Sequence, residues 1–220
     1  SFLVIGLIFS GILALANSTP GIKFIENKNQ WPANIHFTAR VPGGTMIIQP
    51  GKFQYYLLDG QRLEQLHERS HQSINESDGA ASHDEMINGH AVEVSFLGAN
   101  TNLSPLTFGQ SSEYYNYYIG EDPDHWASKA YAYNGFIYPS LYKNIDLKVY
   151  SVGQHVKYDL IVAPNGDPSL VSLHYAGAQT LTLDKHGLAV KTSVGDILEQ
   201  EPVAYQWIGG KKVYVRCEYS

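Results

Sequence analysis

The sequence predicts an all-β fold in which antiparallel strands form a sandwich-like domain. Apolar and polar residues alternate with a period of two in about ten short segments, and Gly, Pro and Asn separate these segments. Helical spacing of apolar residues is rare. The chain has 220 residues, of which 44% are hydrophobic, so it is long enough to bury a core.

The first half is expected to contain short strands joined by turns, at residues 35–41, 45–48, 53–58 and 90–97. Residues 61–69 fit either a strand or a short helix, because Leu63 and Leu66 have a spacing of i, i+3 but support only one or two turns. Residues 70–88 are polar and without periodicity, which predicts a flexible insertion.

The second half is richer in expected strands: 114–119, 130–138, 145–150, 156–162, 170–175, 188–192, 196–198 and 203–207. Residues 145–162 predict a hairpin with residues 151–154 near its tip. Its core face would carry Ile145, Leu147 and Val149 and continue from Val156 to Val162. The opposite rows carry Lys and Asp, which is typical of a solvated face.

One short helical turn is expected near Asp122–Trp126, with Asp122 as the N-cap and Pro123 at the first helical position. Asp122 and Asp124 are also potential Ca²⁺ ligands. The segment lacks the further alternating oxygen ligands of a calcium loop, so a structural role is favoured. Residues 165–168 likewise predict a turn.

Charge composition excludes some classes of partner. Lys and Arg number 15 against 21 Asp and Glu, giving a net charge of −6 with no basic run. Binding to nucleic acid or to an anionic membrane surface requires a basic patch. We therefore expect neither partner.

Residues 2–16 form an uncharged apolar run that ends in Ala14-Leu15-Ala16. This pattern is typical of a signal peptide cleaved after Ala16, which leaves Asn17 as the mature N-terminus and no membrane span; a retained anchor is the alternative. Because residue 1 is Ser and no basic region precedes the run, we expect residues 1–16 to be a partial signal peptide. The expected domain is then 17–220.

The C-terminal residues 212–220 alternate like a strand in mid-course, so this domain is expected to be truncated at its C-terminus. Cys217, the only cysteine, lies on the apolar face of that strand and is expected to be a buried thiol.

Residues 67–71 match the zinc-protease pattern HExxH. On a helix, His67 and His71 would hold Zn²⁺ and Glu68 would polarise water. The short helical pattern, the charged Arg69 and the adjoining polar segment argue against this use. Downstream, His83, Asp84, Glu85 and His90 offer a third ligand without fixing its geometry. No motif nominates a serine nucleophile, a phosphate loop or a dinucleotide site.

Aromatic residues concentrate in the middle of the chain, and exposed Tyr and Trp rings could stack on sugars. Core packing is the favoured interpretation, because tyrosines at a period of two usually fill a sheet interface. The residues concerned are Tyr114, Tyr115, Tyr117, Tyr118, Trp126, Tyr131, Tyr133, Tyr138 and Tyr142.

Six motifs occur in order: FIENKNQWP at 24–32, YNYYIG at 115–120 followed by Asp122-Pro123 and Trp126, LYKNIDL at 141–147, KYDLIV at 157–162, HYAGA at 174–178 and EPVAYQ at 201–206. Together they resemble the N-terminal domain of secreted bacterial proteins with seven-bladed β-propeller (SBBP) repeats and gliding-motility-associated sorting domains. The resemblance implies export by the type IX route and a large multidomain protein, with no catalytic residue to transfer. HExxH is not part of that pattern.

The sequence thus predicts a non-enzymatic structural or binding module of an exported bacterial surface protein. Its expected partners are downstream domains of the same chain and a surface glycan or protein. No catalytic, cofactor-binding or metal-binding residue is assigned, and no cofactor is expected. The alternatives are a zinc-dependent hydrolase using His67, Glu68 and His71, and a glycan-binding module using exposed Tyr and Trp.

Overall fold

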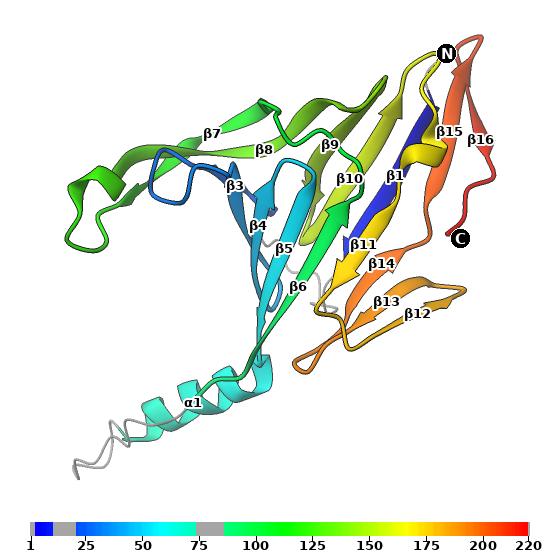
Figure 1. Cartoon of the computed structure of the whole chain (residues 1–220). Coiled ribbons are helices and arrows are strands. Elements are labelled where there is room, and N and C mark those ends of the chain that lie inside the picture. The colour runs from blue at the N-terminus through cyan, green and yellow to red at the C-terminus, as the bar shows by residue number, and fades with distance from the viewer. Residues whose placement is uncertain (1–2, 11–20, 74–85, 220) are drawn as a thin grey trace.

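The computed structural model describes residues 3–10, 21–73 and 86–219, without the side chains of residues 7–10 and 67–73. These residues form strands, one α-helix and two short 3-10 helices (Figure 1). The elements are β1 (Leu3–Ser10), β2 (Phe24–Glu26), β3 (Phe37–Val41), β4 (Gly44–Gln49), β5 (Lys52–Leu58), α1 (Gly60–Ser73), β6 (Gly89–Phe96), β7 (Leu106–Tyr117), η1 (Pro123–His125), β8 (Ala127–Tyr142), β9 (Ile145–Val152), β10 (His155–Val162), η2 (Pro168–Leu170), β11 (Leu173–Ala176), β12 (Thr180–Asp184), β13 (Gly187–Lys191), β14 (Ile197–Gln200), β15 (Val203–Ile208) and β16 (Lys211–Val215).

Within the described residues, the strands are joined in one 16-stranded sheet whose main order is β11-β6-β5-β4-β3-β2-β8-β9-β10-β1-β14-β13-β12. β7 pairs with β8, and β15 pairs with β1 and β16. The sheet folds over on itself: the rings of Phe53 on β5 and Phe96 on β6 lie 6.0 Å and 5.9 Å from that of Tyr158 on the distant β10. This confirms the predicted all-β, sandwich-like class.

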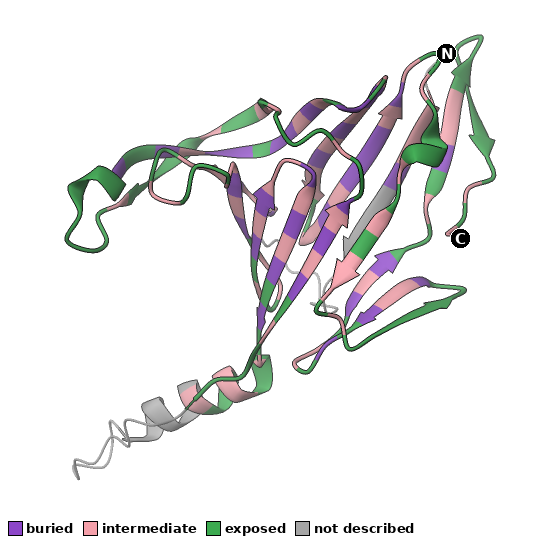
Figure 2. Ribbon diagram, in the orientation of Figure 1, coloured by how far each residue is buried: buried purple, intermediate pink, exposed green. Residues whose placement is uncertain are grey.

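The core lies between the two layers and is rich in aromatic rings. Phe37 on β3 stacks on Phe136 of β8 at 4.5 Å between ring centroids, and Phe24 meets the edge of Phe136 at 5.4 Å. Buried and partly exposed residues alternate along the central strands (Figure 2). The period of two read from the sequence is therefore the packing pattern of the sheet.

The predicted hairpin at 145–162 is confirmed as β9–β10, with Val152 paired to His155 around the turn. Ile145, Leu147 and Val149 are fully buried, as their face predicted. The expectation that all charged positions opposite are solvated is wrong for Asp159, which is only 9% exposed. Asp159 is buried because β1 pairs along β10 and because the Tyr150 hydroxyl donates to its carboxylate at 3.0 Å.

The helical turn expected at 122–126 is confirmed as η1, and the turn expected at 165–168 is confirmed by the hydrogen bond from the Gly166 nitrogen to the Ala163 carbonyl at 2.9 Å, directly before η2. Asp122 caps η1 by accepting from the Asp124 backbone nitrogen, with Pro123 at the first helical position. Asp167 caps η2 in the same way through the Ser169 nitrogen. Asp and Pro set these turns because the side chain accepts an otherwise unpaired N–H and proline fixes φ.

Helix α1 settles the open interpretation of residues 61–69 in favour of a helix, and it is longer than expected. The Asp59 carboxylate accepts from the Arg62 backbone nitrogen at 3.0 Å, which caps the first turn. The helix points away from the sheet (Figure 1). The predicted flexible insertion at 70–88 therefore starts within α1, since residues 70–73 are helical, and residues 74–85 lie outside the described part of the chain.

Three described strands, β1, β2 and β12, were not expected from the sequence. β1 comes from the run assigned to a signal peptide, and it pairs with β10 on one edge and with β14 and β15 on the other. Cys217 follows β16 and is half-buried rather than fully buried; partial burial raises the pKa of its thiol. Among the described residues, no helix has the length and hydropathy needed to cross a bilayer.

Candidate binding surface

The HExxH residues and their candidate third ligands lie in different parts of the molecule. The backbone of residues 67–71 belongs to α1, while the side chains of these residues and all of residues 83–85 are outside the described part of the chain. His90 lies on β6, where Nδ1 is 2.9 Å from the Ser193 hydroxyl and Nε2 is 2.7 Å from the Gly177 carbonyl. Both ring nitrogens of His90 are thus engaged by protein. Among the described side chains, no group of three His, Cys, Asp or Glu is arranged to hold a metal.

The central aromatic residues divide between the core and the surface. Tyr133, Tyr138 and Tyr142 are buried, as the favoured interpretation predicted. Tyr118 is 60% exposed and Trp126 is 43% exposed. Tyr118 and Trp126 lie in the connection between β7 and β8, which in Figure 1 extend beyond the rest of the sheet as an arm that carries η1 at its end.

We define the aromatic tip as Trp31, Tyr117, Tyr118 and Trp126. The Tyr118 and Trp126 rings meet edge to face at 5.8 Å, and Trp126 Nε1 donates to the Gly120 carbonyl at 3.3 Å. Trp31 meets Tyr117 at 5.2 Å. Partial burial against the neighbouring groups raises the pKa of Tyr117. The four rings are therefore held by contacts with one another and with the backbone, and Tyr118 and Trp126 remain exposed while Trp31 and Tyr117 are half-buried.

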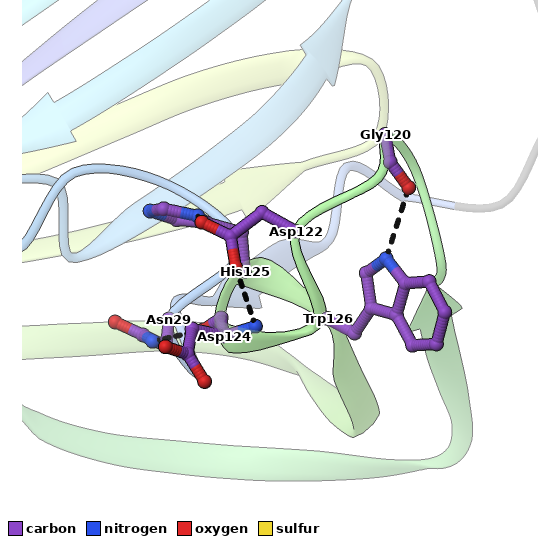
Figure 3. A network of polar contacts seen from close by, with 6 residues as sticks. All are labelled: Asn29, Gly120, Asp122, Asp124, His125 and Trp126. Carbon is purple, nitrogen blue, oxygen red and sulfur yellow. Dashed lines mark hydrogen bonds and ion pairs between the residues drawn. The ribbon is translucent and has the colours of Figure 1, made fainter.

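A polar network fixes the chain beside these rings (Figure 3). One oxygen of the Asp122 carboxylate accepts from the Asp124 backbone nitrogen at 3.0 Å. The other oxygen lies 2.9 Å from His125 Nδ1. These contacts, led by the backbone hydrogen bond, lower the pKa of Asp122. Asn29, from the loop after β2, donates to the Asp124 carbonyl. The network gives the Asp122 carboxylate a structural role in holding the turn, and Asp124 takes part through its backbone nitrogen and carbonyl.

The loop that carries Trp31 is organised by one side chain, that of Asn27. Its amide nitrogen lies 3.0, 3.0 and 2.8 Å from the carbonyls of Trp31, Pro32 and Ile35. Its amide oxygen accepts from the backbone nitrogens of Asn29 and Trp31 at 2.9 and 3.2 Å. A single Asn can thus satisfy several backbone groups of an irregular loop. These hydrogen bonds give the FIENKNQWP motif a structural role, because Asn27 holds the shape of the loop that follows it.

An open groove of about 490 Å³ adjoins this loop and is lined by Glu26, Asn29, His36, Thr107 and Tyr133, among others. Glu26 accepts from the Tyr131 nitrogen at 2.9 Å and from the Tyr133 hydroxyl at 3.1 Å. His36 Nδ1 lies 2.9 Å from the Tyr138 hydroxyl, and burial lowers the His36 pKa, which favours the neutral ring. The groove has the size of a small-molecule site and several polar groups that face it.

Two other features are unsuited to binding a substrate. A cavity of about 60 Å³ between the layers, lined largely by apolar residues such as Ile22, Leu57 and Ile197, has room for a few water molecules only. Glu199 on β14 is fully buried and accepts from the hydroxyls of Tyr158 and Tyr175. Burial raises the pKa of Glu199. The alternation of apolar and polar residues in the sequence did not predict that the Glu199 carboxyl group lies in the core.

The fold and the surface define an all-β domain with a structured aromatic arm. The family model described as "Domain of unknown function (DUF7948)" matches residues 24–220, and the chain belongs to this family. That description names neither an activity nor a secretion route. A search of the curated proteins and a search of the solved structures each find no match to the chain.

Proposed function

We propose that this domain is a non-catalytic binding module of an exported bacterial surface protein and that it binds a saccharide at the aromatic tip and the adjoining groove. The observation that carries the proposal is the exposure of Tyr118 and Trp126 on an arm whose geometry is fixed by hydrogen bonds. Large exposed aromatic rings that are already held in place lose little conformational entropy on binding, and such rings are typical of recognition surfaces.

The chemistry of the surface matches that of sugars, which present C–H faces and hydroxyl groups. The rings of the aromatic tip offer apolar faces, and Tyr hydroxyls offer polar edges. Asn29 and Glu26 line the groove nearby and supply amide and carboxylate groups. A ligand that crosses from the groove to the tip would use both kinds of contact.

Export and attachment to further domains are supported by the apolar run with its Ala14-Leu15-Ala16 end and by the resemblance to SBBP-repeat proteins with type IX sorting domains. In such a protein the domain's other partners would be downstream domains of the same chain. The net charge of −6 supports a ligand other than nucleic acid.

The test is saccharide binding by parent and variant domains on an array of immobilised glycans, followed by calorimetry with each soluble hit. Tyr118→Ala and Trp126→Ala should each weaken binding at least about tenfold, which corresponds to about 1.4 kcal/mol. Trp207→Ala is the matched control, because Trp207 on β15 is an equally large exposed ring away from the arm, at 54% exposure. Binding that survives both tip variants, or that Trp207→Ala abolishes, would contradict the proposal.

The zinc-hydrolase alternative is favoured by one observation: the backbone at residues 67–71 is helical, which places positions 67 and 71 on the same side of α1. Its test is the zinc content after dialysis. A zinc enzyme would retain about one equivalent, lose it in His67→Ala, and lose peptide hydrolysis but not metal in Glu68→Gln. We expect none of these results, since α1 projects away from the sheet in the described part of the chain, where little surrounds it to position a peptide bond.

A further inference from the structure

β1 occupies a position in the sheet that connects two groups of strands. Its pairing with β10 runs from Leu3 opposite Val162 to Phe9 opposite Val156, and its other edge pairs with β15 and β14. Within the described residues, β10 otherwise pairs only with β9, and the β12–β16 strands join the rest of the sheet only through β1. Without β1, three strands present unpaired backbone groups around one gap.

The two faces of this gap demand different side chains. On the core face, Leu3 and Ile5 are in register with Val162 and Leu160, both buried, and they pack against the core. On the other face, Gly6 lies opposite Asp159, and a Cβ at position 6 would stand 2.8 Å from Asp159 Oδ1. The gap therefore accepts apolar residues at alternate positions and favours glycine opposite Asp159, because a Cβ there would force the Asp159 carboxylate to shift.

Two observations separate β1 from the domain that surrounds it. The family match begins at Phe24, so it includes the strands on both sides of the gap but not β1. Residues 2–16 carry the pattern of a signal peptide, whose cleavage would remove β1. Every described strand from β2 to β16 already has a partner in the sheet, so none of them is left to fill the gap.

We propose that the gap between β10 and β15 is a strand-acceptor site, which in the chain that begins at Asn17 binds an extended segment of a second, different polypeptide. The inference rests on the proposed removal of residues 1–16. The ligand runs antiparallel to β10, with apolar residues at alternate positions and a glycine opposite Asp159. Strand addition of this kind derives its affinity from main-chain hydrogen bonds on both edges and its specificity from alternate side-chain pockets.

The experiment uses the chain 17–220, produced directly from Asn17, so that it does not depend on cleavage in the cell. The probe is a synthetic peptide of residues 3–10 with two appended lysines for solubility, and the matched control is the same peptide with Gly6→Val. We expect the first peptide to raise the unfolding temperature and to slow hydrogen exchange at the amides of β10 and β15 that face the gap, because their other amides already pair with β9 and β16. The control peptide should bind at least about tenfold more weakly.

A compensating variant tests the contact itself. In 17–220 with Asp159→Ala, the carboxylate that excludes a Cβ is gone, so the control peptide should bind about as well as the parent peptide. If 17–220 alone is unfolded, the parent peptide should allow it to refold.

Four outcomes would overturn the inference: protection without peptide of the β10 amides that face the gap rather than β9, absence of peptide binding, equal binding of both peptides to the unchanged domain, or failure to fold with the peptide present. A 17–220 dimer dissociated by the peptide would assign the gap to a second copy and refute a different partner. If the peptide fails to bind while Asn17 is found at the N-terminus of exported protein, the strand-acceptor site is refuted and the proposed export stands.

Discussion

At the scale of single residues, Glu199 links ionisation to the stability of the fold. It is fully buried, and burial raises its pKa above the ordinary value of 4.5. The folded state therefore favours the protonated carboxyl. This contribution to stability is fully present below pH 4.5 and is lost as the pH rises through the raised pKa of the folded state.

Glu199→Gln should consequently become more stable relative to the parent protein as the pH rises above 4.5, because Gln keeps the shape and cannot ionise. Glu199→Ala should cost about 1–3 kcal/mol, since it leaves the hydroxyls of Tyr158 and Tyr175 without their acceptor. Urea unfolding of all three proteins between pH 4 and pH 8 measures both effects. A Gln variant whose relative stability is independent of pH would show that Glu199 does not titrate over this range.

Asn27 is the residue on which the loop beneath the aromatic tip depends. Asn27→Ala removes the acceptor of the Asn29 and Trp31 backbone nitrogens, and we expect a loss of about 1–3 kcal/mol in the free energy of unfolding. Trp31 should also lose its fixed contact with Tyr117, which changes Trp fluorescence. Asn102→Ala in an exposed loop is the control and should change neither. An Asn27→Ala protein with unchanged stability would mean that the loop is held by other contacts.

At the scale of elements, the alternating strands were predictable because each buries one face, and β9–β10 is the best example. α1 and β1 were not predictable in the same way. The sequence of α1 contains only two leucines, so the helical spacing of apolar residues is weak. β1 has apolar residues on both faces, which is also typical of a signal peptide. Asp159 was misassigned because burial on its side comes from β1, a strand distant in sequence.

The segment that contains α1 is expected to be dispensable to the fold. Leu58 pairs with Gly89, so the ends of the segment are already adjacent and a short Gly/Asn turn in place of residues 61–87 can join β5 to β6. Met86 is 84% exposed, which fits a segment with little buried surface.

This replacement should change the free energy of unfolding by no more than about 0.5 kcal/mol, as measured by thermal and urea unfolding. A protein with the same length of Gly/Ser chain in place of residues 61–87 controls for loop length. Loss of cooperative unfolding in both would show that the segment packs on the sheet.

At the scale of the whole molecule, the sequence predicted where the aromatic residues concentrate but not which of them are buried and which are exposed. On β8, the Tyr133 ring packs 6.4 Å from that of Phe37 and Tyr138 is fully buried, whereas Tyr118 and Trp126 lie on either side of η1, between β7 and β8, and are exposed. The same local pattern has two outcomes because burial is decided by how the 16-stranded sheet folds over. Ring exposure is therefore a property of the tertiary fold, and only the structure separates the exposed rings from the buried ones.

Residues 1–16 are expected to be removed when the protein is exported. Signal peptidases require small residues at the first and third positions before the cut, and Ala16 and Ala14 supply them. We expect mass spectrometry of the exported protein to find Asn17 at the N-terminus. Ala16→Tyr should block cleavage and leave the precursor in the membrane fraction, whereas Leu15→Phe, at the tolerant middle position, should be processed normally. Exported protein that still carries residues 3–10 would contradict cleavage, and it would mean that β1 remains as a permanent strand joining β10 to β14 and β15.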